Sequence, residues 1–198
     1  MGSGRLETFA DGVFAIAATL LILSVDSQVG NETSGLGDRL LHIWPSYLGY
    51  AVSFLTIGIM WVNHHTIMDC VAKVDRTYLF LTVGFLMCIA FVPFPTRLIA
   101  EHFRGAGAEP AALAYGFTLT VTAVMFNAIW FYAAGGRRLL RADADERLVR
   151  GISRSFLPGA FIYLAATLVA FVSPTASVIL YAAIALVYVL ESSVFARR

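Results

Sequence analysis

Charged side chains are scarce in this 198-residue sequence. Asp, Glu, Lys and Arg together make up only 14% of it, whereas hydrophobic residues make up 59%. A soluble domain carries roughly 25% charged residues, so this chain has too few charges to cover a surface that faces water. The composition is also too apolar for a disordered chain. The sequence therefore predicts a protein that folds in a lipid bilayer.

The signatures of several functional classes are also missing. The formal net charge of +1 gives no reason to expect a nucleic-acid partner. The two cysteines, Cys70 and Cys88, form no CxxC pair, so neither a disulfide framework nor a zinc site is expected. The sequence has no GxSxG or HExxH motif, and its loops are too short for a catalytic domain. We expect no enzymatic activity and no cofactor.

Long apolar stretches, in contrast, are abundant. About 20 helical residues cross a hydrocarbon core of about 30 Å. The last apolar stretch, residues 155–190, is too long for one crossing, and Pro174 near its middle divides it into a helical hairpin. The sequence thus predicts an all-α integral membrane protein, with a single domain over residues 1–198. Its six transmembrane helices are expected at about 6–25, 43–67, 77–97, 110–134, 155–172 and 175–194.

The orientation of these helices follows from the distribution of Lys and Arg, which are enriched in cytoplasmic loops. If the N-terminus is cytoplasmic, eleven of the fourteen basic residues lie inside, and only Arg39, Arg97 and Arg104 lie outside. We therefore predict a multi-pass protein with both termini in the cytoplasm. The charged segment 137–154 is expected to be a solvated cytoplasmic linker.

The first predicted helix carries two distinct stripes on a helical wheel of 100° per residue. A bulky apolar stripe contains Phe9, Val13, Ile16, Leu20 and Leu23. A second stripe contains Asp11, Ala15, Ala18 and Ile22. On the wheel, Asp11 lies about 140° from Ile16. Small residues allow helix backbones to approach each other in lipid, so the second stripe suits helix packing. The bulky stripe faces either lipid or a shared axis in an oligomer, and the residues alone favour lipid.

Polar residues gather at the cytoplasmic end of this helix. A carboxylate such as Asp11 is costly inside a membrane and usually has a partner. The second helix returns to the same depth with the segment Trp61-Val62-Asn63-His64-His65. We therefore expect a cluster of Arg5, Asp11, Trp61, Asn63, His64 and His65. Interhelical hydrogen bonding is the preferred interpretation, and a proton relay or pH sensor is an alternative. A metal site is disfavoured because adjacent His residues diverge by about 100° on a helix.

The same residues resemble the transmembrane protein 175 family, the lysosomal potassium channels and their bacterial homologues. The family motif Arg-x-x-x-Phe-Ser-Asp is represented here by Arg5, Phe9, Ala10 and Asp11. Ala10 stands in place of the usual Ser, so a hydrogen bond from that hydroxyl is absent. The segments Trp61-x-x-His64-His65 and Phe91-Val-Pro93-Phe-Pro95-Thr96 are also similar to the family. The resemblance covers the first three helices, and the last three match mainly by hydropathy.

The resemblance implies a potassium-selective channel without a TVGYG filter, assembled as a homotetramer in a bacterial inner membrane. It implies that the first helix lines the pore, which directs the bulky stripe toward the axis instead of lipid. The expected constriction and ion path comprise Ile16, Thr19, Leu20 and Leu23, with Phe9 at the inner mouth and Asp26 at the outer mouth. Asp11 then faces away from the axis and serves packing. The expected partners are potassium ions, lipid and other copies of the chain.

A proton-coupled secondary transporter is the alternative function. In that case Asp11 and the pair His64/His65 would form the proton-coupling site. Transporters of this kind are commonly built from inverted repeats with interrupted helices. The sequence shows no convincing internal repeat, and its Gly and Pro residues do not pair between the two halves. The channel is therefore the preferred prediction.

Overall fold

The computed structural model describes residues 3–29, 35–103 and 105–195, apart from the side chains of residues 26–29, 39 and 191–195. Within these residues the chain is helical throughout, with a single β-bridge between Val71 and Leu140. The helices are α1 (Gly4–Leu20), α2 (Ile22–Val29), α3 (Leu36–His42), α4 (Trp44–Cys70), α5 (Arg76–Phe91), α6 (Pro93–Glu101), α7 (Ala108–Ala134), η1 (Gly135–Arg137), α8 (Glu146–Val169) and α9 (Pro174–Phe195).

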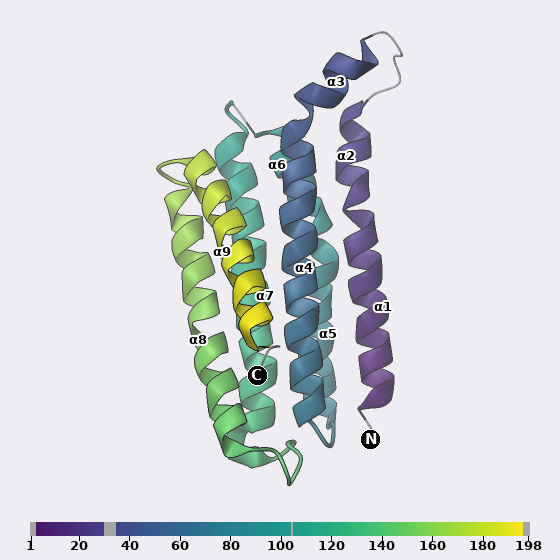
Figure 1. Cartoon of the computed structure of the whole chain (residues 1–198), viewed down its shortest axis with the longest axis vertical. Helices are drawn as coiled ribbons and strands as arrows, with labels where there is room; N and C mark the ends of the chain where they lie inside the picture. The colour runs from purple at the N-terminus through teal and green to yellow at the C-terminus, as the bar shows by residue number, and fades with distance from the viewer. Residues whose placement is uncertain (1–2, 30–34, 104, 196–198) are drawn as a thin grey trace.

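Five segments are long and apolar enough to cross a membrane, which confirms the all-α membrane architecture. They are Gly4–Val25, Trp44–Cys70, Arg76–Glu101, Ala108–Arg137 and Glu146–Val169, and a shorter apolar helix covers Pro174–Leu190. The long helices run side by side, with α1 at one edge of the bundle and α8 at the other (Figure 1). The short helix α3 lies at the end of the bundle far from the N-terminus and projects away from the other helices.

The helix boundaries differ from the predicted ranges at three places. The first span is divided at Leu21, whose backbone remains in the right-handed helical region, so α2 continues the direction of α1. The third span is divided at Val92, because Pro93 and Pro95 have no backbone N–H to continue the hydrogen-bond ladder. The helix α8 begins at Glu146, where the Asp145 carboxylate accepts a hydrogen bond from the Arg147 N–H at 2.8 Å. Half of the expected cytoplasmic linker is therefore helical.

The helix α7 forms the centre of the bundle and packs against α5, α6, α8 and α9. Its Trp130 is fully buried and donates from Nε1 to Ser153 Oγ at 2.9 Å. Asn127 donates from Nδ2 to the Phe156 carbonyl at 3.2 Å, which also joins α7 to α8. These bonds hold α7 against α8, while α5 packs on α7, α4 packs on α6 and α9, and α1 packs on α4 and α5.

The turn between α4 and α5 is held by Asp75, outside the membrane-spanning segments. Its carboxylate accepts from the backbone N–H of Tyr78 and from the Tyr132 hydroxyl, both at 2.8 Å. The Arg138 guanidinium lies 3.6 Å from the same carboxylate and stacks over the Tyr132 ring. The Tyr78 N–H, followed by Tyr132 and Arg138, lowers the pKa of Asp75. Through Asp75, this turn therefore joins the start of α5 to the C-terminal end of α7.

Candidate functional site

The helix α1 packs against the rest of the chain mainly through one face. That face is buried against α4 and α5 and comprises Leu6, Ala10, Phe14, Ala17 and Leu21. It coincides with neither of the two stripes recognised in the sequence. Its residues are spaced by 4, 4, 3 and 4, but the Ile16 stripe is spaced just as regularly, so the spacing alone does not identify the buried face. The Phe14 ring, only 3% exposed, packs against both the His64 ring and the Phe85 ring, which stack on each other.

The bulky stripe of α1 is left largely uncovered by its own chain, and only Val13 is partly buried. Ile16 is 62% exposed and Phe9 is 55% exposed, and Leu20 and Leu23 are exposed as well. Thr19 is also exposed, and its hydroxyl bonds to the carbonyls of Ala15 and Ile16 at 3.0 and 2.9 Å. Asp26 belongs to α2, but its side chain lies outside the described residues. The structure thus leaves one apolar face of α1 free for lipid or for other copies of the chain.

The stripe that contains Asp11 is also largely uncovered. Asp11 and Ala15 are exposed, Ile22 is 51% exposed, and only Ala18 is partly buried. These small residues therefore do not make the main contact of α1 with its own chain. The helix has three faces about 120° apart: one buried in its own bundle, one at Ile16 and one at Asp11.

Asp11 meets the predicted tryptophan on α4. The Trp61 indole donates from Nε1 to Asp11 Oδ1 at 2.8 Å. The imidazole of His65 stacks on Trp61, with ring centroids 6.2 Å apart. His65 Nδ1 lies 3.3 Å from Glu7 Oε1, and its Nε2 lies 3.9 Å from Asp69 Oδ2. Glu7, which the sequence analysis did not single out, thus gives α1 a second polar contact with α4.

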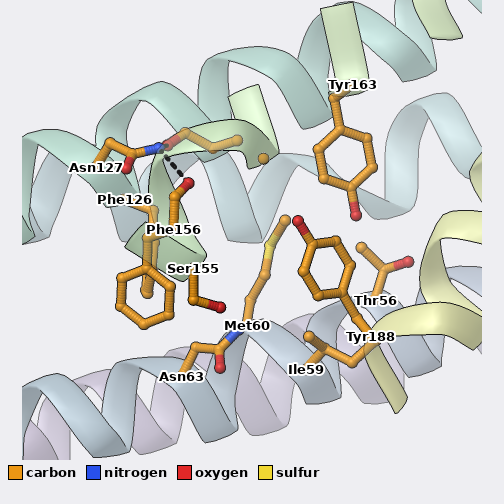
Figure 2. A pocket seen from close by; sticks show the side chains of 12 residues that line it. Thr56, Ile59, Met60, Asn63, Phe126, Asn127, Ser155, Phe156, Tyr163 and Tyr188 are labelled. Carbon is orange, nitrogen blue, oxygen red and sulfur yellow. Dashed lines mark hydrogen bonds between the residues drawn. The ribbon is translucent and has the colours of Figure 1, made fainter. Parts of the chain in front are cut away.

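The other members of the predicted cluster lie elsewhere. His64 is buried and stacks on Phe85, and its Nε2 has no hydrogen-bond partner within the described residues. Asn63 lines a small pocket between α4, α7, α8 and α9, where it lies near Ser155 on the side away from α1 (Figure 2). Arg5 is exposed. Only Asp11, Trp61 and His65 therefore form one connected group, because neighbours on a helix point in different directions.

Among the described residues, no group of three or more His, Cys, Asp and Glu side chains is arranged to hold a metal ion. The polar contacts of α1 are hydrogen bonds and ion pairs with α4. Together with the buried apolar face, they hold α1 against α4 in the observed rotation.

Comparisons with known proteins place the chain among potassium channels. Residues 5–93 match the family model described as endosomal/lysosomal potassium channel TMEM175. A potassium channel of Chamaesiphon minutus is 40% identical over 193 residues, which cover 96% of this chain and 95% of the relative. The chain belongs to the TMEM175 family. The resemblance drawn from Arg5, Phe9 and Asp11 is thus confirmed.

Other TMEM175 relatives extend this result. A potassium channel of Streptomyces collinus is 40% identical over 187 residues, covering 94% of this chain and 91% of the relative. The crystal structure described as a lysosomal potassium-selective channel TMEM175 homologue from Chamaesiphon minutus is 38% identical. It superposes with a TM-score of 0.86 over 96% of this chain and 97% of that one. The chicken endosomal/lysosomal proton channel TMEM175 is 36% identical over 135 residues, but the match covers only 27% of that protein.

Proposed function

We propose that this protein is a potassium-selective channel of a bacterial cell membrane, with its pore lined by α1. The observation that carries the proposal is the superposition of 96% of this chain on the potassium-selective TMEM175 homologue, with a TM-score of 0.86. The exposed stripe at Ile16 is the face of α1 that is available for a shared axis. The TMEM175 relatives that match nearly the whole chain are named potassium channels, which supports the same function. Ion transport through a pore needs no cofactor and no catalytic group.

The three faces of α1 suit a symmetric tetramer. In such an assembly the core face packs on its own bundle, the Ile16 face points to the axis, and the Asp11 face meets a neighbouring copy. A closed ring of four identical subunits repeats one interface that is formed by two different surfaces of each subunit, and each copy of α1 offers two uncovered faces for this purpose. Four copies of Ile16, Leu20 and Leu23 would then form an apolar constriction.

The proposed ion path has polar groups beside this constriction. Apolar constrictions gate by losing water, and a ring of oxygen atoms replaces part of the hydration of an ion. Thr19 supplies such a ring, since its hydroxyl proton is directed to its own helix and its oxygen lone pairs remain available. Phe9 lies toward the inner mouth. Asp26, placed by the sequence at the outer mouth, would concentrate cations there.

The proposed topology has six crossings with both termini in the cytoplasm. Five long apolar helices and the shorter Pro174–Leu190 supply the crossings, and the eleven-to-three distribution of basic residues supplies the orientation. We expect a cysteine at Glu109 to react only from outside and a cysteine at Asp143 only from inside. Labelling of cells with an impermeant maleimide, in a background without Cys70 and Cys88, checks this. Labelling of both positions from one side would refute the topology.

Flux measurements distinguish the channel from the proton-coupled transporter. In liposomes with a K⁺ gradient, we expect K⁺ flux that exceeds Na⁺ flux and needs no proton gradient. Native mass spectrometry of the same preparation is expected to show four chains. Flux that stops when the proton gradient is collapsed would favour a transporter using Asp11 and His65. Proton flux in place of K⁺ flux would align the chain with the animal relatives that are named proton channels.

Asp11 is expected to serve assembly instead of ion selection. Replacing Asp11 with Ala removes the acceptor of the Trp61 bond, which costs on the order of 1 kcal/mol of stability. We expect a lower melting temperature or weaker tetramer, and a nearly unchanged K⁺/Na⁺ permeability ratio in surviving channels. Trp61→Phe should have the same effect, since it removes the donor of the same bond. A large change of selectivity with normal assembly would place Asp11 in the ion path.

A further inference from the structure

A second cavity, separate from α1, lies between α4, α6, α7 and α9. It has a volume of about 320 Å³ and is walled by apolar and aromatic side chains. It sits at the end of the bundle where α4 and α9 begin and α6 ends, the end from which α3 projects (Figure 1). Ligand pockets in proteins typically have volumes of about 300–1,000 Å³ and mostly apolar walls. The cavity therefore has the size and the lining of a ligand site.

The mouth of the cavity opens on the outer flank of the bundle. Leu48 on α4 and Ile179 on α9 both line the cavity and are both exposed. Trp44 stands at the rim, with its ring 5.4 Å from that of Phe103. Both helices are apolar segments of a membrane protein, so the mouth faces hydrocarbon. A tryptophan at the end of such a helix suits the boundary between hydrocarbon and headgroups.

The polar groups at the back of the cavity have no unused donor. Thr96 donates its hydroxyl proton to the Val92 carbonyl at 2.9 Å, so Ser53 must donate to Thr96 at 2.8 Å. Tyr115 must then donate to Ser53 at 2.9 Å. Tyr181, the remaining phenol, donates within the protein to the Ala112 carbonyl or to Thr167. These four hydroxyl protons are therefore directed at other protein atoms.

This pattern selects the chemistry of the occupant. No Lys, Arg, His, Asp or Glu lines the cavity, so a phosphate or carboxylate would be buried without a partner at high cost. Water would find few groups to bond with, and apolar cavities of about 150 Å³ stay dry and bind molecules the size of benzene. A cavity of twice that volume accommodates roughly a dozen carbon atoms. The fitting ligand is a hydrocarbon chain whose headgroup remains at the mouth.

We infer that this cavity binds one acyl chain of a membrane lipid, which enters between α4 and α9 and is held against Gly49. Gly49 leaves the space open: a Cβ atom placed there would be 3.8 Å from Thr96 Cγ2, which is ordinary contact. A leucine at position 49 therefore fits the backbone and fills the cavity. Gly58 on the same helix has open space around it and does not line the cavity, so Gly58→Leu is a matched control.

The test uses lipid with brominated acyl chains, because bromine is located by its anomalous X-ray scattering. Crystals of the full-length protein grown with dibromo-phosphatidylglycerol should show bromine in the cavity of the wild type and of Gly58→Leu. The signal should be lost in Gly49→Leu. If Gly49→Leu does not fold, Ala182→Leu fills the same cavity from α9. Bromine around the outside of the protein but not in the cavity would overturn the inference. A side chain of a neighbouring copy in the cavity, or ordered water there, would overturn it as well.

Discussion

Replacing Ile16 with Asn is expected to raise ion conduction and to lower the preference for K⁺ over Na⁺. Four Asn side chains would hydrate the proposed apolar neck, so that an ion passes it with more of its water. If the barrier falls by ~1.4 kcal/mol, the flux rises about tenfold. The permeability ratio should move toward one, because a wetter neck discriminates less between the two ions. Single-channel recordings under bi-ionic K⁺/Na⁺ conditions measure both quantities.

The matched control for this experiment is Ile22→Asn. Ile22 is also an exposed isoleucine of the first membrane span. It lies on the stripe of Asp11, whereas Ile16 lies on the bulky stripe. We expect this variant to weaken the contact between copies and to leave the selectivity of assembled channels unchanged. The opposite outcome, a changed selectivity in Ile22→Asn and none in Ile16→Asn, would mean that the wrong face of α1 has been assigned to the pore.

Replacing Phe14 with Ala is expected to produce the largest loss of stability of any change in α1. Its ring contacts His64 and Phe85 at centroid distances of 5.8 and 5.9 Å, so the change leaves a void between three helices. Truncation of a buried Phe costs about 3–5 kcal/mol in soluble proteins. The loss here should lie at or below that range, because lipid also solvates separated helices. Thermal unfolding in detergent should show a clear fall in melting temperature.

The variant Phe9→Ala is the control for Phe14→Ala. It removes the same aromatic ring from the same helix, but at an exposed position. Phe9 lies on the same helix, but its ring is uncovered in the single chain. We expect Phe9→Ala to alter conductance at the inner mouth and to leave the melting temperature of the subunit close to that of the wild type. Equal destabilisation by both changes would show that α1 is not anchored through Phe14.

The helical membrane architecture could be predicted from the sequence because apolar stretches of about 20 residues are typical of transmembrane helices. The face by which α1 attaches could not be predicted in this way. In a membrane helix, residues that face lipid are as apolar as residues that face the core, so hydropathy does not separate Phe14 from Ile16. The stripe with Asp11 looked suited to packing because of its alanines. The structure instead buries a different face, on which small and large side chains alternate at Ala10, Phe14 and Ala17.

The direction of each polar side chain could not be predicted from the sequence. Counting residues places Asn63, His64 and His65 close together near the end of one helix. Their side chains, however, point 100° or more apart: His65 meets Glu7, His64 enters the aromatic core, and Asn63 faces α7 and α8. The rotation of a helix depends on contacts with segments far away in the sequence. A single sequence carries little information about those contacts.

The small residues on the buried face of α1 have a consequence for the size of the proposed pore. Ala10 and Ala17 are 0% and 1% exposed, so α1 rests directly on α4 and α5 through methyl groups. In the proposed tetramer, the thickness of this layer would determine how far each copy of α1 stands from the symmetry axis. A bulkier residue there would push four helices inward together and narrow the passage. The diameter of the proposed pore would thus depend on the side chains of the buried face of α1, although these side chains make no contact with ions.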